Sequence, residues 1–242
     1  MITGKSSRSP ILDLARGVAL LGMAIFHFGF DLALFGHVPI TAITTGFMPI
    51  FARIIAGSFL FLSGISFWLA HGAGFRARPF WRRFGLIVLA ALAISLVTRI
   101  AMGETWVRFG ILHAIAACSL LAVALRKAPA WMLFTLAAII LALPSFLASP
   151  AFDSPWLLWL GLAPETPPMM DYEPLLPWLA PFLAGLGLAK MGEGQGWWAR
   201  ILYPGPGRAG LFQWAGRHSL VIYLIHQPVL YSLVWAATKI LR

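Results

Sequence analysis

Four ionisable residues interrupt the first apolar segment of the chain, residues 11–35: they are Asp13, Arg16, His27 and Asp31. At about 100° per residue of an α-helix, the other three side chains project within roughly 60° of Asp13. With a rise of about 1.5 Å per residue, this stripe extends over roughly 27 Å, most of the hydrocarbon thickness of a bilayer. Ionisable groups in a membrane helix are costly and usually face a bundle interior or a wet pathway. The stripe therefore predicts a functional site.

His27 and Asp31 are the strongest catalytic candidates. Their i, i+4 spacing lets the carboxylate reach the imidazole, and such a carboxylate fixes the tautomer of the ring and raises its basicity, as a general base requires. The alternative is that the pair only joins neighbouring helices by hydrogen bonds. The spacing also fits metal ligation, but the chain has no HExxH motif and a single cysteine, Cys118. We therefore expect no metal.

Other polar side chains are candidates for assisting this chemistry. Stabilisation of an oxyanion or positioning of a substrate is assigned to Arg53, Arg108, His113 and His226. The alternative for the arginines is extension toward lipid headgroups, and for the histidines a buried position with satisfied hydrogen bonds. Pro228 follows His226 closely, and proline loosens the local helix, which can free a carbonyl near this imidazole.

The composition is that of an integral membrane protein. The 242 residues are 60% hydrophobic and 11% charged, whereas soluble domains average about 25% charged residues; mean hydropathy is +0.84. We expect an all-α bundle of about seven transmembrane helices in one domain, residues 1–242. The expected spans are residues 11–35, 47–70, 84–101, 109–126, 131–148, 173–190 and 216–238, and the proline-rich segment 149–172 is expected to be an outer loop or re-entrant piece.

Basic residues between the spans predict the orientation. If the N-terminus is cytoplasmic, one side of the membrane collects Lys5, Arg8, Arg76, Arg78, Arg82, Arg83, Arg126, Lys127, Lys190, Arg200, Arg208 and Arg217. The positive-inside rule then places that side in the cytoplasm, with lipid headgroups as partners. This placement accounts for the net charge of +10, so we expect no nucleic-acid partner. The expected location is the cell inner (plasma) membrane, with several spans.

Several motifs follow one another within residues 11–125: Asp-x-x-Arg-Gly, His-Phe-x-Phe-Asp and Arg-Ile-Ile-Ala-Gly in order, and then FGILHAIA around His113. In these motifs the first half of the chain resembles the heparan-α-glucosaminide N-acetyltransferase catalytic-domain family. The closing RHSLVIYLIHQPVL resembles the end of compact bacterial members. The resemblance implies a multi-span enzyme that takes acetyl from cytosolic acetyl-CoA and delivers it to an amine or hydroxyl of a sugar across the membrane.

The resemblance also suggests roles for particular residues. The phosphates of acyl-CoA would meet basic groups at the cytoplasmic side, and the expected donor site is Asp13, Arg16, Arg76, Arg82 and Arg83. The family's proposed catalytic histidine falls near His37, and its animal member has an asparagine in place of His27. Both histidines are therefore candidate bases. We favour His27, because Asp31 accompanies it.

Two other functions compete with the acyltransferase. One is a proton-coupled transporter or flippase in which His27, Asp31 and His226 form a proton relay. The other is a non-catalytic scaffold whose charges join the helices. The small size and the lack of evident internal repeats favour the enzyme, since many transporters are built from doubled units. Gly57 and Gly64 share one helix face, where small residues allow close helix approach, and flat glycine-lined faces in general permit a homodimer.

Overall fold

All regular elements in the described part of the chain are helices. The computed structural model describes residues 9–196 and 210–241. Within these ranges there is no β-strand, and one isolated bridge joins Phe109 to Tyr172. The predicted all-α class is therefore confirmed. Of the residues used to predict the orientation, Lys5, Arg8, Arg200 and Arg208 lie outside the described ranges.

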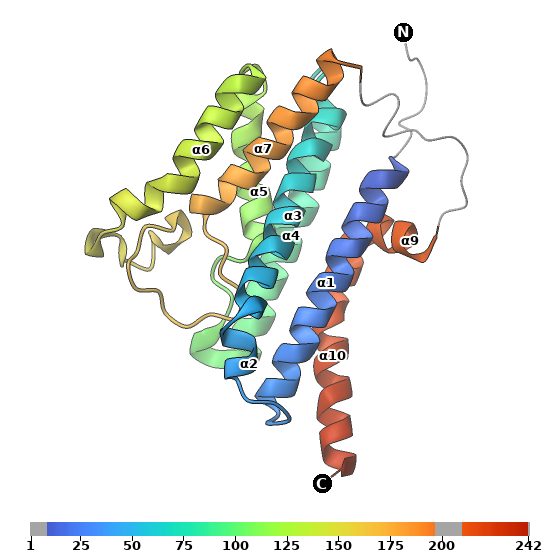
Figure 1. Cartoon of the computed structure of the whole chain (residues 1–242), viewed down its shortest axis with the longest axis vertical. Coiled ribbons are helices and arrows are strands. Elements are labelled where there is room, and N and C mark those ends of the chain that lie inside the picture. Colours follow the sequence, from blue (N-terminus) through green and yellow to red (C-terminus); the bar gives the residue numbers. More distant parts are fainter. Residues whose placement is uncertain (1–8, 197–209, 242) are drawn as a thin grey trace. The chain divides into compact units, whose positions relative to one another are not determined.

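The seven expected spans correspond to seven helices in the described ranges. They are α1 (Pro10–Leu34), α3 (Phe47–His71), α4 (Ala77–Met102), α5 (Ile111–Leu125), α6 (Ala130–Leu147), α7 (Leu175–Gly194) and α10 (Ser219–Leu241), labelled in Figure 1. Six are long and apolar enough to cross a membrane. The exception is α5, whose 15 residues extend over only about 22 Å, against about 30 Å of hydrocarbon.

Two helix boundaries differ from the sequence prediction. The fourth helix begins at Ala77 rather than near residue 84, so Arg78, Arg82 and Arg83 lie in its first two turns instead of a loop. The last expected span is divided, because His218 leaves helical geometry (φ −105°, ψ 22°) between α9 (Leu211–Arg217) and α10. Neither α9 nor the four-residue helix α2 (Thr41–Thr44) was predicted.

Three short 3₁₀ helices complete the secondary structure of the described residues. They are η1 (Gly103–Thr105), η2 (Pro150–Phe152) and η3 (Leu158–Leu160). The last two lie within the segment 149–172, which otherwise consists of turns and extended residues. Burial raises the pKa of the Tyr172 phenol above its ordinary value, and its hydroxyl donates to the Leu158 carbonyl at 2.7 Å.

The helices form two compact units. The first contains residues 1–55 and 196–242, and within its described part α1 packs against both α9 and α10 (Figure 1). Glycines allow the backbones of α1 and α9 to touch: a Cβ on Gly17 would overlap the carbonyl oxygen of Phe212, and one on Gly216 would overlap that of Asp13. This close approach brings the first turns of α1 next to α9.

The second unit contains residues 56–195. In it α7 packs against α6 and α5, and α4 packs against α5. Here too glycines set a crossing: a Cβ on Gly64 of α3 would overlap the Phe182 carbonyl, and one on Gly185 of α7 would overlap the Phe61 carbonyl. Small residues at such crossings are typical of membrane helix packing. The face of α3 that carries Gly64 therefore packs against α7 of the same chain.

Candidate functional site

A polar cluster lies where α1 meets α10 in the first unit. The imidazole rings of His27 and His226 are 4.9 Å apart between centroids and inclined by 62°. One turn further along α1, the side chain of Asp31 is fully buried, and its Oδ1 accepts a hydrogen bond from Gln227 Nε2 at 2.8 Å. Two polar residues of α1 thus meet two consecutive polar residues of α10.

Hydrogen bonding determines which nitrogen of His226 carries the proton. Its Nδ1 lies 2.6 Å from the backbone carbonyl oxygen of Tyr223. A carbonyl oxygen only accepts, so Nδ1 carries the hydrogen of the neutral ring. The other nitrogen, Nε2, is therefore a hydrogen-bond acceptor.

Four polar atoms of this cluster are buried and have no hydrogen-bond partner among the described residues. They are His27 Nδ1, Asp31 Oδ2, His226 Nε2 and Gln227 Oε1. More than about nine in ten buried polar groups in proteins are hydrogen-bonded, and an unpaired one costs roughly 1–3 kcal/mol. Four such atoms within two helical turns are typical of a site that acts on a ligand or on protons.

The contact expected between Asp31 and His27 is not formed as a hydrogen bond in the described part of the chain. The carboxylate bonds instead to Gln227, and the imidazole faces His226. We did not identify Gln227 from the sequence. A polar amide beside His226 in an otherwise apolar helix was the available signal, because such a group is costly in a bilayer unless it has a partner.

The other end of the α1 stripe is an ion-pair network. Asp13 is 3% exposed, and its two carboxylate oxygens face Arg16 at 3.2 Å and Arg217 at 3.3 Å. Asp13 and Arg16 lie three residues apart on α1, a spacing at which side chains of one helix meet. The second partner, on α9, was not predicted. The Asp13 carboxylate therefore joins α1 to α9.

His37 and Arg53 also belong to the first unit. His37 follows α1 and is exposed, and its Nε2 lies 2.6 Å from Thr238 Oγ1. The Thr238 hydroxyl donates its hydrogen to the Val234 carbonyl, so His37 Nε2 must be the donor in this contact, and Nδ1 is left as the acceptor. Arg53 is exposed near the start of α3.

His113 of the second unit uses both ring nitrogens. Its Nδ1 accepts from the backbone of Gly110 at 3.2 Å, and its Nε2 lies 3.3 Å from the Ser95 hydroxyl, which donates to the Val107 carbonyl at 2.7 Å. These bonds tie the start of α5 to α4. The hydrogen bonds of this part-buried histidine are thus made within the chain.

Arg108 and Asp171 lie close to the same end of α5. The Arg108 guanidinium is 3.6 Å from the exposed Glu104 and lies over the Trp106 ring at 5.3 Å, and its NH1 is buried with no partner among the described residues. Asp171 accepts from the backbone of Ile111 at 3.1 Å, as expected for a carboxylate at a helix N-terminus.

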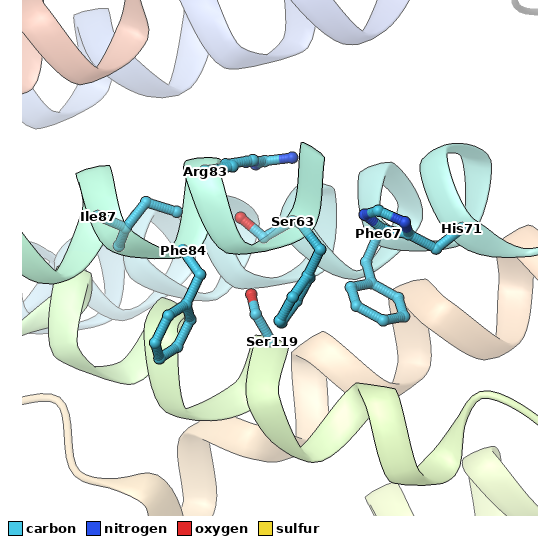
Figure 2. Close-up of a pocket in the computed structure, with 8 residues that line it drawn as sticks. Ser63, Phe67, His71, Arg83, Phe84, Ile87 and Ser119 are labelled. Atoms are coloured by element: carbon cyan, nitrogen blue, oxygen red, sulfur yellow. The ribbon is translucent and has the colours of Figure 1, made fainter. Parts of the chain in front are cut away.

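The arginines expected to bind an anionic donor lie at the start of α4. Arg76 is the residue before the helix, Arg82 and Arg83 lie in its second turn, and all three are exposed. Arg83 also lines a small hollow of the second unit, together with His71 (Figure 2). Within the described residues, no group of three or more His, Cys, Asp or Glu side chains is arranged to hold a metal ion.

Comparison with known protein families gives a match over most of the chain. The family model described as "Heparan-alpha-glucosaminide N-acetyltransferase, catalytic" matches residues 8–228, a range that includes the whole cluster from His27 to Gln227. No curated protein and no solved structure matches the chain.

Proposed function

Because the chain belongs to the heparan-α-glucosaminide N-acetyltransferase catalytic family, a family of membrane acetyltransferases, we propose that it moves an acetyl (acyl) group from cytosolic acyl-CoA to a sugar hydroxyl or amine. The acceptor lies at or beyond the outer face of the cell inner membrane. The observation that carries this proposal is the buried His27–His226–Asp31–Gln227 cluster with its four unpartnered polar atoms.

The polarity of the cluster fits an acceptor substrate. Asp31 Oδ2, Gln227 Oε1 and His226 Nε2 all accept hydrogen bonds, and none of them has a partner among the described residues. An O–H or N–H group of the acceptor would supply the missing donor. The neutral His226 presents no free N–H to an oxyanion. We therefore assign it to binding of the acceptor substrate rather than to oxyanion stabilisation.

His27 is the proposed general base. It removes the proton of the acceptor hydroxyl or amine while the oxygen or nitrogen forms a bond to the thioester carbonyl carbon. The carbon–sulfur bond then breaks, and the proton passes from the imidazolium to the leaving thiolate, so the products are the acylated acceptor and free CoA. The buried Asp31 stabilises the imidazolium. An acyl-histidine formed first on His27 is the two-step version of this reaction.

Arg53 is the candidate for stabilising the oxyanion, since it belongs to the same unit as the cluster and a guanidinium is a strong donor to a developing negative charge. Arg108 and His113 belong to the second unit, and no step is assigned to them. His37 is the alternative base, since its Nδ1 is left as an acceptor.

Radiolabelled acetyl-CoA tests the proposal on the purified protein in detergent. We expect slow thioester hydrolysis or labelling of the protein, both reduced at least ~100-fold in His27→Ala, as for loss of a general base. The matched control is His218→Ala, which removes an exposed histidine of the same unit. Loss of activity in His37→Ala instead would assign the base to His37. Absence of any CoA binding would overturn the acyltransferase.

The adjacent rings of His27 and His226 also suit proton exchange, so a proton-coupled transporter is the second candidate. Proteoliposomes distinguish the two functions. Proton flux that needs no CoA and is lost in His27→Ala and His226→Ala would favour the transporter. Transfer of acetyl from external acetyl-CoA without such flux would favour the enzyme.

A further inference from the structure

A small hollow in the second unit has both apolar and polar walls. It lies among α3, α4 and α5, and its polar side chains are Ser63, His71, Arg83 and Ser119; the apolar ones are Phe67, Phe80, Phe84 and Ile87. Figure 2 shows the two serine hydroxyls facing the same space, with the Arg83 side chain extending toward the side on which His71 lies. Among the described residues, no carboxylate lines it.

His71 is the buried donor of this hollow. The side chain is 6% exposed, and its Nδ1 accepts a hydrogen bond from the backbone N–H of Arg76 at 3.4 Å. The hydrogen of the neutral ring therefore lies on Nε2. The other contacts of the ring are with Phe67, Phe75 and Phe80, so Nε2 has no hydrogen-bond partner among the described residues.

The hollow is also positively charged and rich in hydroxyl groups. Arg83 lines the hollow, and Arg76 is the residue whose backbone N–H donates to the His71 ring. Ser63 of α3 and Ser119 of α5 add two hydroxyl groups to its lining. Donors of this kind complement an anion with several oxygen atoms, and guanidinium groups bind phosphate especially well.

We propose that this hollow is a phosphate-binding site in which His71, Arg83 and the two serines hold one phosphate oxygen. The space accommodates about one water-sized group, so the remaining oxygens lie at its mouth beside the exposed Arg83. Two sources supply this chemistry, the phosphates of acyl-CoA and the headgroup of a phospholipid. The assignment to acyl-CoA rests on the proposed function, whereas phosphate binding does not.

Binding measurements on the full chain in a phosphate-free detergent test the site. We expect His71→Phe and Arg83→Gln to weaken CoA binding about tenfold or more, as for loss of a hydrogen bond to a charged group. Pantetheine, which lacks phosphate, should bind equally to all variants. His71→Gln keeps a donor near the position of Nε2 and should restore part of the affinity. Ser63→Ala with Ser119→Ala is the mildest variant and should weaken CoA binding less.

Arg99→Gln is the matched control, because Arg99 is an exposed arginine of the same helix that pairs with Glu104. It should leave CoA binding unchanged. Binding of a phospholipid headgroup is tested separately, by native mass spectrometry of the phosphatidylglycerol that each variant retains. A loss of retained lipid without a change in CoA affinity supports the phosphate site and assigns it to the headgroup. Variants that retain both CoA and lipid like the parent protein overturn the site.

The outcomes separate this inference from the proposed function. If phosphate binding depends on His71 and Arg83 but the protein transfers no acetyl group, the phosphate site is supported and the proposed function is contradicted. The opposite outcome is acetyl transfer in which every variant of the hollow has the KM for acetyl-CoA of the parent protein and retains the same lipid. It would support the proposed function and contradict the phosphate site.

Discussion

Asp31 is fully buried, and the one hydrogen bond that its carboxylate makes in the described part of the chain comes from Gln227. This bond also determines the orientation of the amide, because the reverse orientation would place Oε1 against the carboxylate oxygen. Removal of the amide would leave a buried carboxylate with no donor. At the scale of single residues, the cluster therefore depends on Gln227 as much as on the ionisable groups.

Gln227→Leu is expected to destabilise the protein by roughly 1–3 kcal/mol, the cost of an unsatisfied buried group, and to lower acetyl transfer. The measurements are thermal unfolding in detergent and the kcat of transfer. Gln213→Leu makes the same chemical change on α9, where that amide has no hydrogen bond to another described residue, and should have little effect. Equal behaviour of the two variants would contradict the role of Gln227.

At the scale of helices, glycine contacts decide which elements can touch. Gly64 and Gly185 each face a backbone carbonyl of the other helix, of Phe182 and Phe61 respectively. A backbone atom cannot rotate away as a side chain does, so an added methyl group forces α3 and α7 apart. Gly85, by contrast, lies within α4, and a Cβ there would meet nothing within 4 Å.

Gly64→Ala and Gly185→Ala are each expected to destabilise the protein by about 1–3 kcal/mol, as in other overpacked contacts. Gly85→Ala should instead be neutral or stabilise it by about 0.5–1 kcal/mol, because alanine has the higher helix propensity. Thermal unfolding of the three single variants checks this order. A stability loss for Gly85→Ala as large as for the other two would refute it.

At the scale of the whole molecule, the distribution of charge predicts the orientation in the membrane. Arginines gather at the start of α4, whereas Asp153 and Glu165 lie in the segment before α7. The positive-inside rule places the arginines in the cytoplasm and the acidic segment outside. The phosphate site proposed beside Arg83 would then open toward the cytoplasm, where acyl-CoA is available.

Cysteine labelling tests this orientation. Cys118 is the single cysteine of the sequence, so a Cys118→Ala background contains no thiol except the one introduced. Cys118 is fully buried. In intact cells, an impermeant maleimide should label Asp153→Cys but not Arg78→Cys. In inside-out vesicles the pattern should reverse, and permeabilised cells, in which both sites react, provide the control. Labelling of Arg78→Cys in intact cells would require the opposite orientation.

Helix positions and the stripe along α1 follow from the sequence by itself. Hydropathy and helical periodicity are local properties, so the seven apolar segments and the pairing of Asp13 with Arg16 were predictable. The exact helix ends were less so, because α4 extends over arginines that hydropathy places in a loop, and a single turn at His218 separates α9 from α10.

Only the tertiary structure decided which partners these residues have. Asp31 bonds to Gln227 and Asp13 to Arg217 across 196 and 204 residues of sequence. No local pattern determines such pairs, because they depend on how closely two helices approach and in which register. In this protein, glycines at the contact between α1 and α9 set that approach. A stripe of costly polar groups was therefore visible in the sequence, and its division into an ion-pair network and a buried histidine cluster was not.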